Sequence, residues 1–205
     1  MSDVYLKAWH GGLGDALQFS TLPEEFSKQQ ERKTYILGDA PFRNEGIYDL
    51  VWDKNPYVCG KKFGEWNAGD LPSIPYREDG FLEENGTGNM IPNWEKFHGL
   101  KPSNKYPKVY YQPEKDKGVK DLFVVDFTST TVNDNKEEVV RCLDKIRNEH
   151  PDRKFVSVSF EDIVPTRDLS DDIKFDGYIE VENIFRYCDL ISSVYGYVSL
   201  HSGGT

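Results

Sequence analysis

The sequence has few cysteines, no long apolar run and no excess of basic residues, and each of these absences excludes a class of protein. The cysteines are isolated and odd in number, which excludes a disulfide framework and a cysteine metal site: Cys59, Cys142 and Cys188. No window approaches the roughly 18 apolar residues of a membrane helix. The start at Met1-Ser2-Asp3 shows no charged and then apolar leader, so we expect a cytoplasmic protein.

The charge balance limits the partners of the protein. With 35 acidic and 25 basic residues, the chain carries a formal net charge of −10. A basic face that binds nucleic acid is therefore not expected. Hydrophobic residues make up 38% of the 205 positions, which is enough for the core of one large domain or two small ones.

Two glycine-rich turns stand near opposite ends of the chain, and each follows an apolar run. The first turn, His10–Asp15, comes after Val4–Trp9, and the second, His201–Thr205, comes after Tyr197–Leu200. Each pattern predicts a strand that ends in a tight loop, where backbone N–H groups can meet an anion. Because a helix should follow the second loop and cover the sheet, the sequence also predicts a C-terminal truncation.

Strand and helix patterns alternate in the first half of the sequence. A strand at 4–9, a helix from Asp15 to about Gln30 and a strand at Thr34–Leu37 form a β-α-β unit, in which Pro23 marks a kink or a restart of the helix. Residues 41–88 are irregular, with Val51–Trp52 and Tyr57–Val58 as candidate short strands. A short helix at 92–100 follows and ends near Gly99.

The alternation restarts after a non-apolar linker at about 112–119. The expected elements are strands at 122–127, 155–160, 178–181 and 197–200, with helices at 136–149 and 182–193. The predicted fold class is therefore α/β, with two Rossmann-like halves that face a cleft. The first half covers residues 1–112, and the second, incomplete half covers residues 119–205.

The first glycine turn differs from the common nucleotide-binding motifs. It gives Gly12-x-Gly14-x-x-Leu17, in which leucine replaces the third glycine of the dinucleotide fingerprint, and no Lys-Ser or Lys-Thr pair follows. Asp39 could still mimic the acid that binds ribose, so a nicotinamide-dependent oxidoreductase stays an alternative. Asp15 has two interpretations: a cap on its helix, or a carboxylate that takes a proton from a hydroxyl.

Several segments together resemble one enzyme family. They are Gly11-Gly12-Leu13-Gly14-Asp15-Ala16-Leu17 with Thr21-Leu22-Pro23, then Asn55-Pro56-Tyr57-Val58, then Tyr187–Ile191 with Leu200–Thr205. This pattern is similar to that of the heptosyltransferase-like glycosyltransferases, family nine, which have the GT-B fold. The resemblance implies transfer of a sugar from a nucleotide diphosphate sugar to an acceptor hydroxyl, as in glycan or lipopolysaccharide-type synthesis. The alternative to an enzyme is a non-catalytic protein that binds a nucleotide sugar or a glycan.

The resemblance also implies roles for individual residues. Asp15 matches the proposed general base, and Gly12, Leu13 and Gly14 match its acceptor-side loop. The donor would meet two groups of residues: Thr128, Ser129 and Thr130, then His201, Ser202, Gly203, Gly204 and Thr205. His201 stands where the family commonly has aspartate. The family implies no cofactor and no bound metal, since the nucleotide sugar is a substrate, and the Asp171-Asp172 pair indicates a solvated turn.

One histidine has a simpler expected role. His98 precedes Gly99 near the end of the predicted helix at 92–100. A positive charge at that position would interact favourably with the helix dipole.

Overall fold

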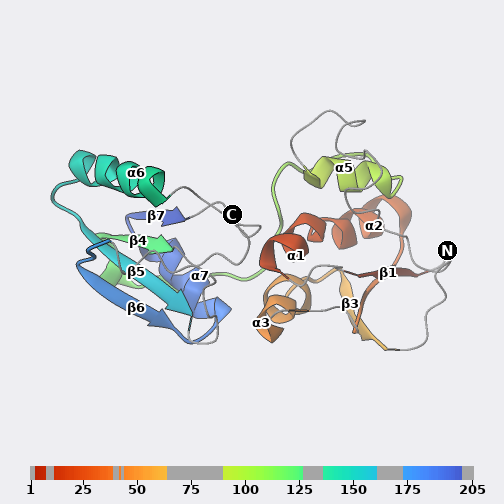
Figure 1. Ribbon diagram of the computed structural model, residues 1–205. Helices are drawn as coiled ribbons and strands as arrows, with labels where there is room; N and C mark the ends of the chain where they lie inside the picture. The colour runs from red at the N-terminus through yellow and green to blue at the C-terminus, as the bar shows by residue number, and fades with distance from the viewer. Residues whose placement is uncertain are drawn as a thin grey trace. The chain divides into compact units, whose positions relative to one another are not determined.

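The computed structural model describes residues 3–7, 12–38, 42, 44–63, 90–126, 136–160 and 173–199. Contacts divide the chain into two compact units, Met1–Tyr111 and Gln112–Thr205. Each unit is built on a parallel sheet with helices packed against it (Figure 1). The predicted α/β class with parallel sheets is therefore confirmed.

The described sheet of the first unit has the strand order β1-β2-β3, with bounds Val4–Leu6, Thr34–Leu37 and Val58–Lys62. Between β1 and β2 the chain forms α1 (Leu13–Phe19) and α2 (Leu22–Gln30). Pro23 lies in the first turn of α2, where its missing N–H breaks no helical hydrogen bond. Of the two alternatives for Pro23, a kink or a restart of the helix, the structure shows the restart, since α1 ends at Phe19 and α2 begins at Leu22.

The connection from β2 to β3 is helical. Helix α3 (Glu45–Tyr48) begins at Asn44, whose side chain accepts a hydrogen bond from the Gly46 N–H at 2.7 Å, and runs into a π-helical turn, η1 (Asp49–Asp53). The strand predicted at Val51–Trp52 is therefore wrong. Two apolar residues are too few to show the periodicity of a strand or a helix. Here both residues belong to a helical turn, and their side chains are buried.

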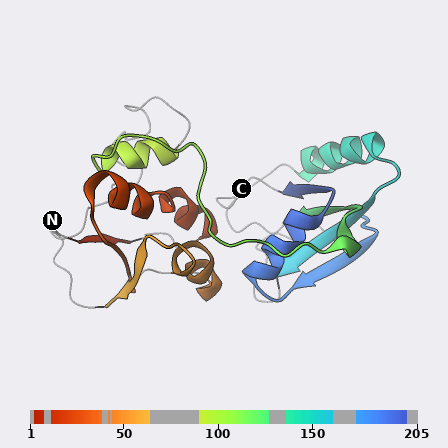
Figure 2. The same cartoon turned by 180° about the vertical axis from the view of Figure 1, so that it is seen from behind.

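Helix α5 (Met90–Phe97) packs against α1 and α2, as the view from behind also shows (Figure 2). The Phe19 and Trp94 rings meet at a centroid distance of 4.8 Å in this contact. Gly99 follows the helix with a φ of +71°, which favours glycine, and its N–H donates to the Lys96 carbonyl.

The segment after α5 has no regular structure, and buried glutamates hold it in place. Glu24 accepts hydrogen bonds from Lys28, Lys108 and Tyr110, which outweigh the opposing effect of burial and lower its pKa to about 2. Asn104 donates to Glu25 at 2.9 Å and to Glu95 at 2.7 Å. Along residues 101–110, hydrogen bonds from backbone and side-chain groups thus take the place of the regular backbone hydrogen bonds of a helix or a sheet.

The described sheet of the second unit has the order β6-β5-β4-β7, and all its strands are parallel. Its elements in chain order are η2 (Lys117–Val119), β4 (Leu122–Asp126), α6 (Lys136–Glu149), β5 (Lys154–Phe160), β6 (Gly177–Val181), α7 (Ile184–Ser193) and β7 (Gly196–Ser199). The predicted strands and helices of this half are all present, with ends shifted by at most a few residues.

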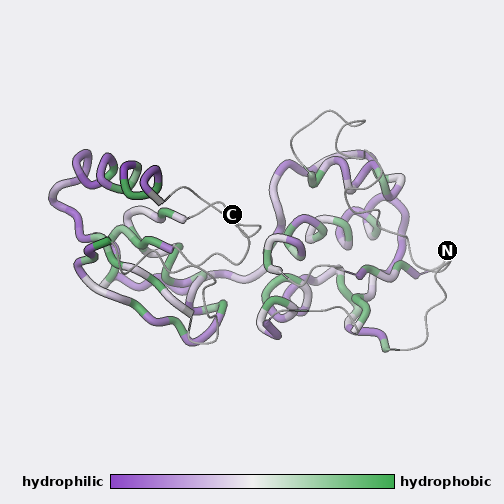
Figure 3. The backbone as a smooth tube through the Cα atoms, in the orientation of Figure 1, coloured by the Kyte–Doolittle hydropathy of each residue, from purple (hydrophilic) through white to green (hydrophobic). Residues whose placement is uncertain are grey.

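Helices α6 and α7 cover opposite faces of this sheet. Phe123 and Val125 pack in a cluster with Leu143 of α6, whereas Val124 packs with Tyr187 and Leu190 of α7. The side of α6 that faces away from the sheet is mainly hydrophilic (Figure 3). Strand β4 is buried on both sides, which explains its continuous apolar sequence.

His98 is buried rather than charged. Burial, reinforced by the positive charge of Arg32, lowers the pKa of His98 to about 4. Its ring lies edge-on to Phe26 and Phe97, and among the described residues its Nε2 atom has no hydrogen-bond partner. The predicted interaction of a charged His98 with the helix dipole is therefore wrong, since the ring is neutral at pH 7.

We expect the His98→Phe variant to lose part of the acid sensitivity of folding. The folded pKa of His98 lies below its ordinary value of 6.5, so the unfolded chain binds the proton first. Stability is complete above pH 6.5 and falls toward pH 4, by about 2–3 kcal/mol between pH 6.5 and 4.5. Urea unfolding at several pH values measures this. If the free energy of unfolding changes equally with pH in wild type and variant, His98 does not contribute to the acid sensitivity.

We expect Gly196→Ala to destabilise the second unit, because a Cβ atom at Gly196 would overlap the Phe123 ring. The cost should be about 1–3 kcal/mol, typical of overpacking in a core. Gly177→Ala is the matched control, since its Cβ would meet Val156 at an ordinary 3.6 Å. Urea midpoints compare the two variants, and an unchanged midpoint for Gly196→Ala would contradict this expectation.

Candidate functional site

In the second unit, the direction in which the chain adds successive strands to the sheet reverses, and the reversal lies between β4 and β7. From β4 the chain passes through α6 to β5 and β6, and it returns through α7 to the other side of β4. In open parallel sheets, ligands bind in the crevice outside the carboxyl ends of two such strands. Here these ends are Asp126 and Ser199, which are partners in register. This edge is the candidate functional site.

Asp126 ends β4 with a carboxylate that two tyrosine hydroxyls contact. Tyr187 of α7 donates to Asp126 Oδ2 at 2.5 Å, and Tyr197 of β7 makes a longer contact of 3.4 Å to the same atom. The two hydroxyls also hydrogen-bond to each other. Asp126 and Tyr187 are buried, whereas Tyr197 is 37% exposed, so the cluster reaches the surface at Tyr197.

Both tyrosines stay protonated at neutral pH. Burial, followed by the negative charge of Asp126, raises the pKa of Tyr187. Burial also raises the pKa of Tyr197. Each hydroxyl therefore keeps one proton to donate at neutral pH, and the proton of Tyr187 goes to the Asp126 carboxylate at the end of β4.

Sequence reasoning did not find this cluster. Its members are 61 and 10 residues apart, and only the fold brings them together. The available signal was a single carboxylate, Asp126, at the end of an otherwise apolar strand. In a parallel sheet that position lies at the ligand-binding edge.

In the first unit, Asp15 lies in the first turn of α1. Its Oδ2 atom accepts a hydrogen bond from the Gly12 N–H at 3.2 Å, and Gly12 is the extended residue that precedes the helix. Leu13 and Gly14 form the first residues of α1. The capping interpretation of Asp15 is thus present in the structure, and its role as a base stays a prediction.

The fold also joins two segments of the family resemblance. The Asn55 side chain is 1% exposed and donates to the Ser20 carbonyl oxygen at 3.3 Å. Its own oxygen accepts from the Tyr57 N–H at 3.0 Å. Asn55 therefore fixes the start of β3 to the junction of α1 and α2, where Thr21-Leu22-Pro23 begins.

The predicted donor-binding residues lie outside the described residues. They are Thr128, Ser129, Thr130, His201, Ser202, Gly203, Gly204 and Thr205. In sequence they follow Asp126 and Ser199 within a few positions. The donor assignment therefore stays a prediction that concerns this edge of the second sheet.

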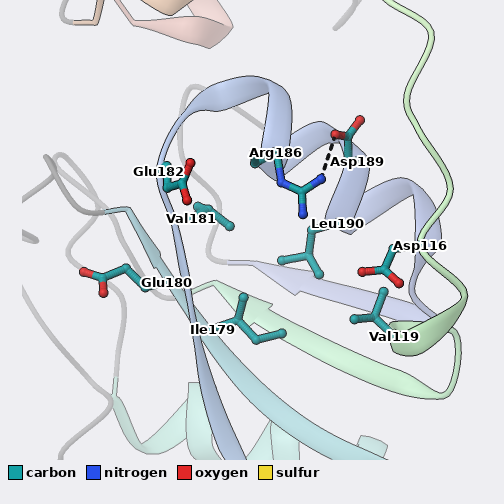
Figure 4. Close-up of a pocket in the computed structure, with 9 residues that line it drawn as sticks. All are labelled: Asp116, Val119, Ile179, Glu180, Val181, Glu182, Arg186, Asp189 and Leu190. Carbon is teal, nitrogen blue, oxygen red and sulfur yellow. Dashed lines mark ion pairs between the residues drawn. The ribbon is translucent and has the colours of Figure 1, made fainter.

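A pocket of about 160 Å³ lies elsewhere in the second unit, between η2, β6 and α7 (Figure 4). Arg186 points toward Asp189 across its rim, with Nη1 and Oδ2 3.6 Å apart. The apolar side chains of the lining are Val119, Ile179, Val181 and Leu190, and the charged ones are Asp116, Glu180, Glu182, Arg186 and Asp189. Most of its charges are negative, so it is a poor match for a phosphate.

The part of the chain that the structure describes contains no cluster of three or more His, Cys, Asp or Glu side chains that could bind a metal ion. Within that same part, no helix combines the length and apolar character needed to cross a bilayer.

The comparisons with known proteins reveal a likeness of fold. No protein-family model matches the chain, and no curated protein matches it. It is similar to a structure of TibC from enterotoxigenic E. coli, described as a bacterial iron-containing dodecameric glycosyltransferase, with a TM-score of 0.61 and 12% identity. A second TibC structure, described as a heptosyltransferase in complex with ADP-D-beta-D-heptose, gives a TM-score of 0.59 and 12% identity.

The likeness covers 98% of this chain and 53% of the TibC chain, so the chain spans about half the length of its structural neighbour. At 12% identity the comparison shows the fold and does not identify the reaction. The chain has a glycosyltransferase-like α/β fold.

Proposed function

We propose that the protein transfers a sugar from a nucleotide diphosphate sugar to an acceptor hydroxyl. The observation that carries this proposal is the likeness in fold, over 98% of the chain, to a glycosyltransferase. That neighbour is also described in complex with an ADP-heptose. The motifs that resemble the heptosyltransferase-like family support the same reaction class and a GT-B arrangement, with residues 1–112 on the acceptor side and 119–205 on the donor side.

The donor side of this proposal rests on the topology of the second unit. Its sheet changes winding direction at β4 and β7, which is the position where α/β sheets bind nucleotides. The hydroxyl-rich Thr128–Thr130 and the glycine-rich His201–Thr205 come shortly after these strands in sequence. Loop N–H groups and hydroxyls would stabilise the leaving diphosphate, without a cofactor or a bound metal.

In the proposed reaction Asp15 acts on the acceptor. The acceptor oxygen forms a bond to the anomeric carbon as the bond from that carbon to the diphosphate breaks, and Asp15 takes the hydroxyl proton. The Gly12 N–H fixes one oxygen of this carboxylate. The same contact explains why capping and catalysis are compatible roles for one side chain.

We expect Asp15→Asn to lose sugar transfer by about 10²–10⁴-fold while it keeps its folding stability. Asparagine can still accept the Gly12 N–H through its amide oxygen but cannot take a proton. The measurements are thermal melting and release of nucleoside diphosphate from a panel of nucleotide sugars. Glu45→Gln, an exposed first-turn acid of α3, is the matched control. Turnover within a few-fold of wild type would leave Asp15 as a cap only.

We expect a nucleoside diphosphate to protect the second unit from hydrogen exchange more than the first. The protected amides should lie at the carboxyl ends of β4 and β7, near Asp126 and Ser199. Exchange with and without ADP, GDP or UDP measures this. Protection restricted to residues 12–16 would contradict the donor assignment and favour a dinucleotide site in the first unit.

A further inference from the structure

We propose that the pocket between η2, β6 and α7 docks a basic segment of a partner protein, with one lysine or arginine side chain inserted into it (Figure 4). The pocket lining includes neither Asp126 nor Ser199, the last residues of β4 and β7. The docking surface is therefore separate from the edge assigned to the donor, and it goes beyond the proposed reaction.

The size of the pocket limits its occupant to one side chain. Its volume is about 160 Å³. Sites for drug-sized molecules span roughly 300–1,000 Å³, whereas a cavity of about 150 Å³ holds a benzene molecule. A nucleotide sugar is therefore too large for this pocket, and the side chain of a lysine or an arginine is of a suitable size.

The lining joins an apolar floor to an acidic rim. Val181 and Leu190 form the buried part of the floor, and both belong to the apolar cluster that joins α7 to the sheet. The carboxylates around this floor are those of Asp116, Glu180, Glu182 and Asp189. Lysine and arginine match both parts, because their aliphatic stems pack on apolar surface and their charged heads form strong hydrogen bonds with carboxylates.

A metal ion is a poorer match for the same carboxylates. The apolar floor offers no ligand, and across the residues that the structure describes no group of three or more His, Cys, Asp or Glu could hold a metal ion. Hard cations need several oxygen ligands at once. A cation on an aliphatic chain instead uses the floor and the rim together.

Arg186 shows within the structure what this rim attracts. Its guanidinium points across the rim, with Nη1 3.6 Å from Asp189 Oδ2, and its side chain is 58% exposed. The other oxygen of Asp189 accepts the Glu114 N–H at 2.9 Å, so this carboxylate is engaged on both sides. An incoming cation would therefore meet the exposed Glu180 and Glu182, and Arg186 would compete with it for the acidic rim.

The wall of the pocket on the side of η2 is formed before any partner binds. The Asp116 N–H donates to Ser193 Oγ of α7 at 2.9 Å. The Asp116 carboxylate accepts the Gly118 N–H at 2.8 Å, which fixes its orientation. Docking thus requires little ordering of this wall, and a small ordering cost favours binding.

The position of β6 favours a protein segment over a free amine. Among the described strands, β6 lies at the edge of its sheet and pairs only with β5. An edge strand offers backbone N–H and C=O groups to an added chain. One charge-assisted hydrogen bond gives only about a ten- to hundredfold gain in affinity, so a segment that also lies along β6 would bind more tightly than an amine alone.

The test uses the full 205-residue chain and a set of host pentapeptides. Valine and threonine flank a central guest residue, which is lysine, arginine, norleucine or glutamate. Norleucine keeps the apolar stem of lysine without its charge. NMR shifts of the backbone amides locate the contact and give its affinity, and cadaverine serves as the free amine.

The variants change only exposed side chains. Glu180→Gln and Glu182→Gln remove rim charges, and Arg186→Gln removes the competing cation. Glu138→Gln is the matched control, because Glu138 is an exposed acid of α6, which covers the opposite face of the sheet. Melting temperatures check that each variant keeps its fold.

The lysine and arginine peptides should bind about tenfold more tightly than the norleucine peptide and shift the amides at 179–182, and the glutamate peptide should not bind. Glu180→Gln and Glu182→Gln should each weaken the lysine peptide about two- to fivefold, which is typical of an exposed ion pair. Arg186→Gln should strengthen it, and Glu138→Gln should leave it unchanged.

Three results would overturn the proposal. The first is that no peptide shifts these amides. The second is that all four peptides bind alike, because the rim charge would then select nothing. The third is that cadaverine binds as tightly as the lysine peptide, which would make the pocket a site for free amines. None of these results bears on sugar transfer, so the proposed function is tested separately.

Discussion

The burial of β4 on both faces is the constraint on which the second unit depends. Val124 and Val125 are fully buried, one against α7 and the other against α6. Because a parallel strand needs helices on both faces, the connections on its two sides must cover opposite surfaces of the sheet. The need to cover apolar surface on both faces therefore accounts for the change in winding direction between β4 and β7, where Asp126 lies.

The first unit meets a different constraint, which is the pairing of buried carboxylates. Glu24, Glu25 and Glu95 are each at most 6% exposed, and burial of an unpaired charge would be costly. Lys108, Tyr110 and Asn104 supply the partners, and all three belong to the irregular segment at 101–110. The chain thus satisfies its buried acids with a segment that has no sheet or helix of its own, and the acids in turn fix the path of that segment.

Local patterns predicted most of the elements because their periods are strong. The helix Lys136–Glu149 and the strand Thr34–Leu37 have the predicted bounds. The strand prediction at Val51–Trp52 was wrong because two apolar residues fit a buried helical turn as well as a strand. The charge state of His98 could not be predicted, since it depends on burial by Phe26, which lies far away in sequence. The Asp126 cluster was missed for the same reason, because its hydrogen bonds join separate elements of the fold.

Asp15 lies in the first turn of α1 and Asp126 is the last residue of β4. The structure holds these two carboxylates in different ways. A backbone N–H three residues earlier in the chain contacts Asp15 in the first turn of a short helix. Tyrosine side chains from two other elements hold Asp126, so its position depends on the assembled sheet. The proton transfer proposed for Asp15 needs a carboxylate near the surface, and a backbone donor is compatible with that position. The buried hydroxyl of Tyr187 instead fixes one oxygen of the Asp126 carboxylate from a separate helix, so the orientation of that carboxylate depends on how α7 packs against the sheet.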